Sequence, residues 1–196
     1  MLSARTCIER GFITFDEKKV HLIDEEELTL EQLLNQYRST FKGLGSLGSD
    51  YELTLKDDAV PVVHAPRRVP ITLKKKLKDT LDELVLNKVI APVKEPTDWV
   101  SSLVVAEKKN GKLRVCIDPK DLNNNLKRSH YPLPTLDEII PDLNKCKVFS
   151  TFDCRNGYWQ VALSEETSYL TTFNSPFGRY RWLRMPFGLS SASEEY

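Results

Sequence analysis

An Asn-Gly dipeptide between two alternating apolar segments constrains the fold of this chain more than any other feature. Asn110-Gly111 separates residues 101–109 from residues 112–118. In the second segment, Leu113, Val115 and Ile117 share one face, and Arg114, Cys116 and Asp118 share the other. Because Asn-Gly accepts the positive φ angles of a tight two-residue turn, the pattern predicts a β-hairpin.

The predicted hairpin has a basic tip, formed by Lys108, Lys109 and Lys112. Such a tip can bind phosphate groups, or it can simply protect the hairpin from pairing with other strands at its edge. The local sequence does not choose between these two roles.

Capping patterns and apolar periodicity predict four helices. The first covers residues 29–41, with Thr29 and Gln32 in a capping box, and a glycine-rich linker at 43–48 follows it. The second begins at Thr72 and places four leucines on one face, namely Leu73, Leu77, Leu81 and Leu84. Thr135 and Glu138 cap a third helix that Pro141 should interrupt, and the last begins near Ser191 and Glu194.

Further alternation predicts strands in the second half of the chain and a short one at 51–55. Residues 147–152 form a strand that runs into Asp153, and Trp159, Val161 and Leu163 suggest a returning strand. A second hairpin joins residues 171–174 to 179–182 through a turn at 175–178. Because helices mix with partly antiparallel strands, the predicted class is α+β.

Composition limits the general class of protein. The 196 residues carry 28 basic and 28 acidic side chains, and 40% of them are hydrophobic. This is globular composition for one domain, or one domain with a leader. We expect no membrane partner, because no apolar run approaches the roughly 18 residues that span a bilayer. The four cysteines show no paired spacing, which favours a reducing, intracellular location, cytoplasmic or nuclear.

Charge is distributed unevenly along the chain. Residues 61–128 contain 15 basic and 8 acidic residues, whereas residues 1–60 contain 7 and 12. A basic middle segment points weakly to a polyanionic partner. The alternative is a solvated lysine-rich helix and hairpin.

Asp153 is the candidate for metal chemistry. A carboxylate at the end of a strand can form a turn or cap a helix, but it can also be a rigid Mg²⁺ ligand. Mg²⁺ uses few protein oxygens and keeps the rest of its shell for water and phosphates. Gly157, four residues later, would let backbone or ligand approach closely.

Seven short motifs, taken in order, carry a family resemblance. They are Pro66-Arg67-Arg68-Val69-Pro70, Asp98-Trp99-Val100-Ser101-Ser102, Lys108-Lys109-Asn110-Gly111-Lys112-Leu113-Arg114, Asp118-Pro119-Lys120-Asp121-Leu122-Asn123, His130-Tyr131-Pro132-Leu133-Pro134-Thr135, Phe152-Asp153 through Gly157-Tyr158-Trp159-Gln160, and Met185-Pro186-Phe187-Gly188-Leu189. Residues 61–196 thereby resemble the reverse transcriptase of gypsy-type long-terminal-repeat retrotransposons.

The resemblance implies a right-hand polymerase with fingers and a partial palm. The fingers would use residues 61–128 and about 162–190, and the palm would use about 131–161 and residues from 191 onward. Residues 1–60 would be an acidic leader with one helix: residues 29–60 resemble the family's connector, and residues 1–20 are a possible remnant of a protease tail.

The resemblance also implies roles for single residues. Asp153 would be the first catalytic carboxylate, holding two Mg²⁺ ions that clamp the attacking and leaving oxygens. Arg114, together with Lys108 or Lys109, would bind the phosphates of the incoming deoxynucleoside triphosphate. Tyr158 would be the steric gate that excludes a ribose 2′-hydroxyl. Phe187 and Gly188 would line the nucleotide pocket. Asp118 could hold Arg114 or a lysine in place. Arg67, Arg68 and Lys112 would contact an RNA or DNA template-primer, and the remainder of a pol polyprotein would be a further partner.

The sequence also departs from the family pattern. The second carboxylate motif, x-Asp-Asp, does not follow Asp153, and the one adjacent pair, Asp57-Asp58, lies upstream. We therefore expect a polypeptide of residues 1–196 to be a truncated polymerase domain that is inactive by itself. Two alternatives stay open: a non-catalytic nucleic-acid-binding module, and a non-functional gene relic that folds poorly.

Overall fold

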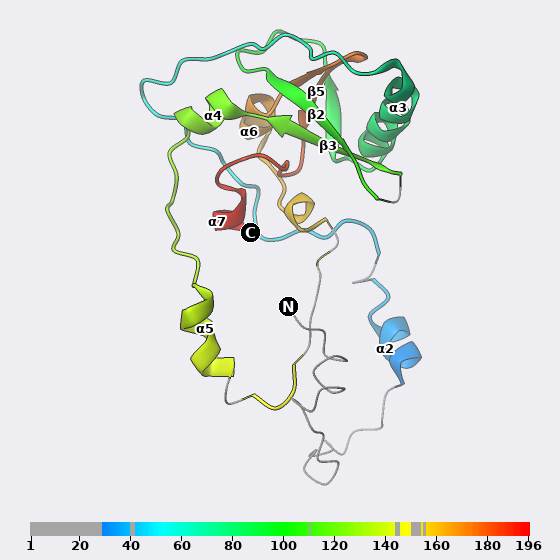
Figure 1. Cartoon of the computed structure of the whole chain (residues 1–196), viewed down its shortest axis with the longest axis vertical. Coiled ribbons are helices and arrows are strands. Elements are labelled where there is room, and N and C mark those ends of the chain that lie inside the picture. Colours follow the sequence, from blue (N-terminus) through cyan, green and yellow to red (C-terminus); the bar gives the residue numbers. More distant parts are fainter. Residues whose placement is uncertain (1–28, 40–41, 110, 144–145, 150–153, 155) are drawn as a thin grey trace. The chain divides into compact units, whose positions relative to one another are not determined.

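The computed structural model describes residues 29–39, 42–109, 111–143, 146–149, 154 and 156–196 (Figure 1). The chain divides into two compact units. One contains Met1–Lys42 and Leu133–Arg155, and the other contains Gly43–Pro132 and Asn156–Tyr196. Helices and a mixed sheet both occur, which confirms the predicted α+β class.

The described part of the smaller unit contains two helices, and both begin at predicted capping boxes. Helix α2 (Leu30–Gln36) has reciprocal bonds between Thr29 and Gln32, at 2.8 and 3.2 Å. It ends at Gln36, earlier than the predicted residue 41. Before helix α5 (Leu136–Leu143), the Thr135 amide donates to the Glu138 carboxylate at 2.6 Å, and this bond lowers the pKa of Glu138.

Two predictions in the smaller unit change. Pro141 lies inside α5 and does not end it, because its ring removes one intrahelical bond without preventing helical φ and ψ angles around it. The predicted strand over 147–152 lies mostly outside the described residues. Its described part, residues 147–149, is not in a strand.

The larger unit is built on a five-stranded sheet in the order β1-β5-β4-β2-β3. Its strands are β1 (Ile90–Val93), β2 (Ser101–Glu107), β3 (Leu113–Asp118), β4 (Phe173–Ser175) and β5 (Gly178–Trp182). Strands β2 and β3 form the predicted first hairpin, and β4 and β5 form the second. The two hairpins meet through a parallel pairing of β2 with β4.

The turn of the first hairpin differs from the prediction. The Gly111 amide donates to the Lys108 carbonyl at 2.9 Å, and Lys108 N donates back to Lys112 O at 2.8 Å. The loop is therefore three residues long, and Gly111 supplies the positive φ angle of 75° at its last position. Asn110 lies outside the described residues.

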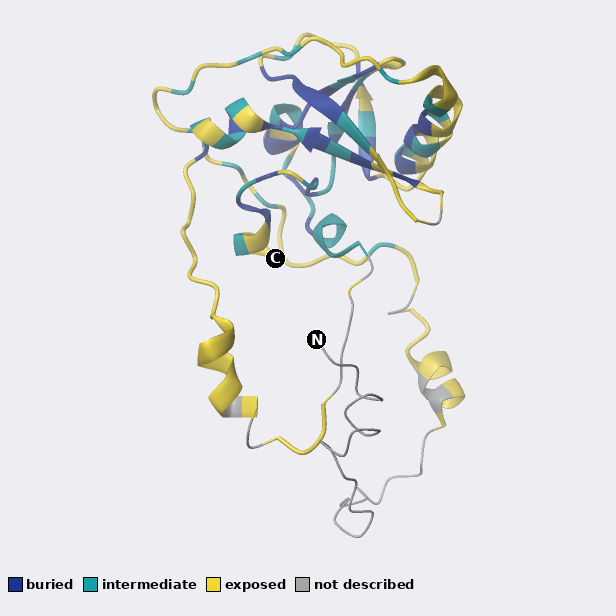
Figure 2. Ribbon diagram, viewed as in Figure 1, coloured by how far each residue is buried: buried dark blue, intermediate teal, exposed yellow. Residues whose placement is uncertain are grey.

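Helix α3 (Ile71–Leu86) packs against the sheet, where it contacts β1 and β3. Its buried face carries Leu77, Leu81 and Leu84, as the periodicity predicted, and Leu73 is partly buried. Figure 2 shows the contrast between the buried and the exposed sides of this helix. The core of the unit joins this helix face to buried side chains of all five strands.

Two predicted strands are wrong. Residues 51–55 make only isolated bridges, because the two ends of this extended segment pair with different partners: Tyr51 with Leu163, and Leu55 with Leu126. Residues 157–160 form a short 3-10 helix, η1 (Gly157–Gln160), with Asn156 before it in the left-handed region. The predicted linker at 43–48 is partly packed: Leu44 contacts the core, and Leu47 N donates to Gln160 O at 2.8 Å.

Three short helices complete the larger unit. They are α4 (Lys120–Asn125) after β3, α6 (Glu165–Leu170) before β4, and α7 (Ala192–Glu195) near Tyr196. The predicted helix near Ser191 is thus confirmed. Among the residues that the structure describes, no helix has the length and apolarity needed to cross a membrane.

Candidate functional site

Two of the predicted nucleotide residues, Arg114 and Tyr158, contact a third, the aromatic ring of Phe187. The guanidinium carbon of Arg114 lies 5.5 Å from the centre of this ring. On another side, the Tyr158 ring lies 5.0 Å from it at an interplanar angle of 48°. Three segments far apart in sequence, β3, η1 and the 187–190 loop, therefore meet at one place.

Arg114 reaches Phe187 because of strand alternation. Leu113, Val115 and Ile117 are buried toward the core, so Arg114 lies on the opposite, exposed face of β3. A cation above an aromatic face is attracted by the ring quadrupole, which restrains the guanidinium without neutralising it. Arg114 therefore keeps its charge and its N–H donors for a ligand.

A glycine sets the approach of the 187–190 loop to the sheet. Gly188 has a φ angle of 116°, and a Cβ added there would lie 2.5 Å from the carbonyl oxygen of Ile117 on β3. The Ile117 amide also points to the Phe187 carbonyl, at 3.5 Å. Only glycine allows this backbone-to-backbone contact, and the contact places Phe187 beside Arg114.

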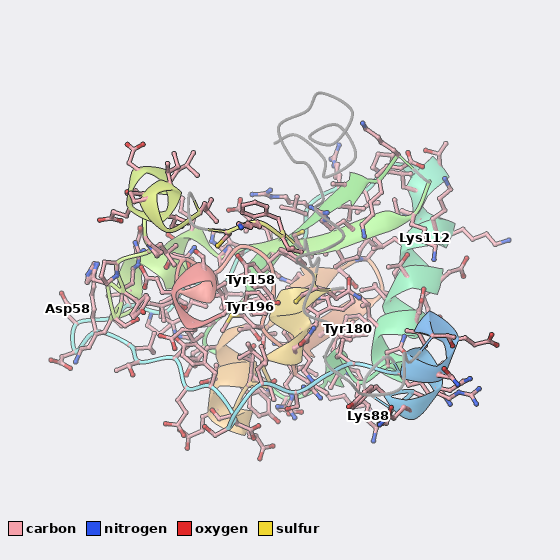
Figure 3. The ribbon with its side chains drawn as sticks, turned by 90° about the horizontal axis from the view of Figure 1, so that it is seen from below. Asp58, Lys88, Lys112, Tyr158, Tyr180 and Tyr196 are labelled. Carbon is pink, nitrogen blue, oxygen red and sulfur yellow. The ribbon has the colours of Figure 1, made fainter. Side chains whose placement is uncertain are left out.

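Tyr158 has a second aromatic neighbour that the sequence did not indicate. Tyr196 meets it edge-on, with ring centres 5.5 Å apart, and Figure 3 shows the two residues side by side. Gly157 permits this, since a Cβ there would lie 2.7 Å from the Tyr196 ring. No local pattern links residues 158 and 196, so this contact could not have been predicted.

Asn123, part of a motif quoted above, also contacts the site without having been predicted to do so. Its side chain bonds to Gly188 O and to Ser190 N. An asparagine at the end of a short helix is common, so only its contacts in the fold reveal a role.

The basic residues at the hairpin tip and before α3 are exposed. Lys108, Lys109 and Lys112 surround the turn, and Figure 3 labels Lys112 at this tip. Lys112 and Arg114 are two residues apart, so the pleat directs both to the same face. Arg68 is exposed as well.

Arg67 and Asp118 form an ion pair, with Arg67 Nη2 at 2.5 Å from Asp118 Oδ2. The expectation that Asp118 holds Arg114 or a lysine is therefore replaced by this contact. Both side chains stay about half exposed, at 52% and 44%. Such a half-exposed pair contributes little to stability.

The metal candidate, Asp153, lies outside the described residues. Within the described ranges, no group of three or more His, Cys, Asp or Glu side chains is arranged to hold a metal ion. Cys116, on the same face of β3 as Arg114, is half buried, and this burial raises the pKa of its thiol. A protonated thiol is a poor nucleophile and a poor metal ligand.

Comparisons with known proteins agree with one another. Residues 106–193 match the family described as "Reverse transcriptase (RNA-dependent DNA polymerase)". The chain is 35% identical over 142 residues to the "Enzymatic polyprotein" of Cauliflower mosaic virus (strain Strasbourg), covering 71% of the chain and 21% of the relative. It is 31% identical over 185 residues to the "Retrovirus-related Pol polyprotein from transposon 297" of Drosophila melanogaster, covering 88% and 17%. The chain thus spans about a fifth of the length of these relatives.

Solved structures show the same fold. Prototype Foamy Virus Protease-Reverse Transcriptase matches with a TM-score of 0.70 at 18% identity, covering 83% of this chain and 22% of the other. A foamy viral protease-reverse transcriptase in complex with an RNA/DNA hybrid matches with a TM-score of 0.65 at 15% identity, covering 83% and 22%.

Proposed function

We propose that the chain is part of the reverse transcriptase domain of a retroelement pol polyprotein, and that it supplies the fingers and the opening of the palm of an RNA-directed DNA polymerase. The fingers comprise residues 61–128 and about 162–190. The gypsy type is part of the proposal, and it rests on the seven ordered motifs. The complete enzyme would extend a primer from deoxynucleoside triphosphates on an RNA or DNA template.

The observation that carries the proposal is the Arg114–Phe187–Tyr158 cluster. Arg114 offers a planar fork of donors that suits paired phosphate oxygens, and Phe187 restrains it from behind. Tyr158 contacts the same ring, and an aromatic side chain under the sugar would exclude a 2′-hydroxyl by steric clash. Lys108 and Lys109 add positive charge for the triphosphate, and Gly188 gives backbone access to the base.

Asp153 completes the proposal as a Mg²⁺ ligand. A carboxylate oxygen is the type of ligand that Mg²⁺ prefers, so the residue type fits the ion. Bound Mg²⁺ supplies charge neutralisation for in-line phosphoryl transfer. Since no Asp-Asp pair follows Asp153 in the 196 residues, a polypeptide of these residues should not extend a primer in Mg²⁺-dependent assays. Robust extension would contradict this part of the proposal.

We propose template-primer and the rest of the polyprotein as macromolecular partners. Arg67, Arg68 and Lys112 are exposed basic residues of the fingers, suited to phosphate contacts. The foamy viral neighbours were solved with dsDNA and with an RNA/DNA hybrid, which supports a nucleic-acid partner of this kind.

Two arginines that stack on aromatic rings make a matched test. Arg114→Ala should raise the Kd for dTTP about tenfold, since it removes charged donors from the pocket. Arg181, on β5, also stacks on an aromatic ring, at 4.3 Å from the centre of Tyr169. Arg181→Ala should leave the dTTP Kd unchanged. Equal affinity of both variants, measured by titration calorimetry, would overturn the proposed pocket.

A non-catalytic nucleic-acid-binding module is the second candidate, and the exposed lysines of the hairpin tip favour it. Such a module would bind an RNA–DNA hybrid with strong salt dependence but would not bind dTTP. The same titration therefore separates the two functions.

A further inference from the structure

The side-chain amide of Asn123 joins α4 to the loop that carries Phe187. Its Nδ2 donates to the carbonyl of Gly188 at 2.9 Å, and its Oδ1 accepts from the amide of Ser190 at 3.0 Å. A carbonyl can only accept and an amide can only donate, so this orientation of the side chain is the one that satisfies both partners.

Leu189 anchors the loop in the core, but few hydrogen bonds other than those of Asn123 hold its backbone beside the pocket. The Ile117 amide lies 3.5 Å from Phe187 O, which is a long hydrogen bond. Gly188 itself is exposed and has no side chain to hold it in place. Phe187 meanwhile is in contact with both Arg114 and Tyr158. A small shift of the loop would therefore move the ring that both residues contact.

Helix α4 gives Asn123 a fixed base. The adjacent Leu122 is buried in the core, and Asn123 N donates to the Pro119 carbonyl at 2.8 Å. The neighbouring asparagines contact other segments: Asn125 bonds to Asp121 O and Val60 N, whereas Asn124 is exposed. Of these three asparagines, Asn123 is the one whose side chain bonds to the 187–190 loop.

We propose that Asn123 is a positioning residue for the nucleotide pocket, because its side-chain amide holds the Phe187–Ser190 backbone against the end of β3. The Phe187 ring then stays in contact with Arg114 and Tyr158, in the arrangement that binds a deoxynucleoside triphosphate. This role rests on the function proposed above. Asn123 acts through the loop and does not itself contact the nucleotide.

The test combines hydrogen exchange with dTTP titration on the 196-residue chain. Asn123→Ala should accelerate exchange of the Ser190 amide at least tenfold and raise the dTTP Kd about tenfold, the loss expected for two hydrogen bonds. Asn124→Ala is the matched control, and it should change neither value. Should Asn123→Ala fail to fold, Asn123→Asp provides the second variant, because its carboxylate still accepts from Ser190 but cannot donate to Gly188. It should keep Ser190 protected and still bind dTTP more weakly.

The outcomes separate this role from the proposed function. Arg114→Ala should weaken dTTP binding without changing the exchange rate of the Ser190 amide. A general loss of structure would change both measurements, so it would not give this result. If the wild-type chain binds dTTP and Asn123→Ala binds it equally well, or if Ser190 exchange is unchanged in Asn123→Ala, the positioning role is overturned alone. A wild-type chain that binds no dTTP overturns the proposed pocket, and the positioning role with it.

Discussion

The two hairpins of the sheet place similar residues in different surroundings. The β4–β5 hairpin is central, between β1 and β2, and its Phe173 and Trp182 are fully buried with ring centres 5.9 Å apart. The β2–β3 hairpin ends the sheet at β3, whose Arg114 is exposed. A central strand pairs with a neighbouring strand on each side, so its buried residues mainly stabilise the fold. The edge strand β3 pairs with a strand on one side only, and the loop that carries Phe187 contacts it.

The largest effect should come from the central hairpin. Trp182→Ala should lower the free energy of unfolding by about 3–5 kcal/mol, because it removes a buried ring from the core. Its backbone also accepts from Ser168 Oγ at 2.5 Å and donates to Thr171 Oγ1 at 3.2 Å, so the site cannot easily collapse. The measurement is urea unfolding.

The matching variant on the edge hairpin is Lys112→Ala, which should change the free energy of unfolding by less than about 0.5 kcal/mol. Similar losses from both variants would contradict the contrast between the hairpins. The same experiment tests whether the wild-type chain folds: a cooperative transition of the soluble monomer would count against a poorly folding gene relic.

An intermediate effect should come from two glycines with nearly equal backbone angles. Gly178, at the start of β5, has φ 117° with nothing within 4 Å of an added Cβ, and Gly188 has φ 116° with Ile117 O at 2.5 Å. Both alanine variants incur the cost of a positive φ angle, about 1–2 kcal/mol. Only Gly188→Ala must also move the loop, so it should be the less stable and should bind dTTP more weakly. Equal melting temperatures and equal dTTP affinities would show that the close contact with β3 is unimportant.

The smallest effect concerns pH and the helix that follows the edge loop. Arg128 donates to Glu194 on α7, and this hydrogen bond holds the pKa of Glu194 below its ordinary value of 4.5. A lowered pKa in the folded state stabilises the fold above pH 4.5, and this contribution is lost as the pH falls through the folded-state value. Unfolding measured from pH 6 to pH 3 should therefore show less acid sensitivity in Glu194→Gln.

The control for this pH effect lies beside the central hairpin. Glu165 forms a longer and largely exposed ion pair, 3.7 Å from Arg181, so Glu165→Gln is the matched control. The same pH dependence in both glutamine variants would rule out a special contribution of the Arg128–Glu194 pair.

Much of the secondary structure could be predicted because its causes are local. Turn residues and period-two alternation located both hairpins, and leucine spacing identified the buried face of α3. The capping boxes at Thr29 and Thr135 were also found by pattern. Where local patterns were ambiguous the predictions failed: apolar alternation at 159–163 indicated a strand, but these residues enter a 3-10 helix and then two isolated bridges.

In the candidate site, too, some features follow from the local sequence and others from tertiary contacts. Strand alternation in the sequence by itself determined that Arg114 leaves the core, and the family resemblance of the Pro-Phe-Gly motif predicted that Phe187 and Gly188 line a nucleotide pocket. Only the tertiary structure decided that Phe187 lies beneath Arg114, that Asp118 pairs with Arg67, and that Asn123 holds the loop. The reason is physical: dihedral preference and side-chain period act between near neighbours, whereas contacts between residues 51 or more positions apart depend on how the whole sheet and its loops pack.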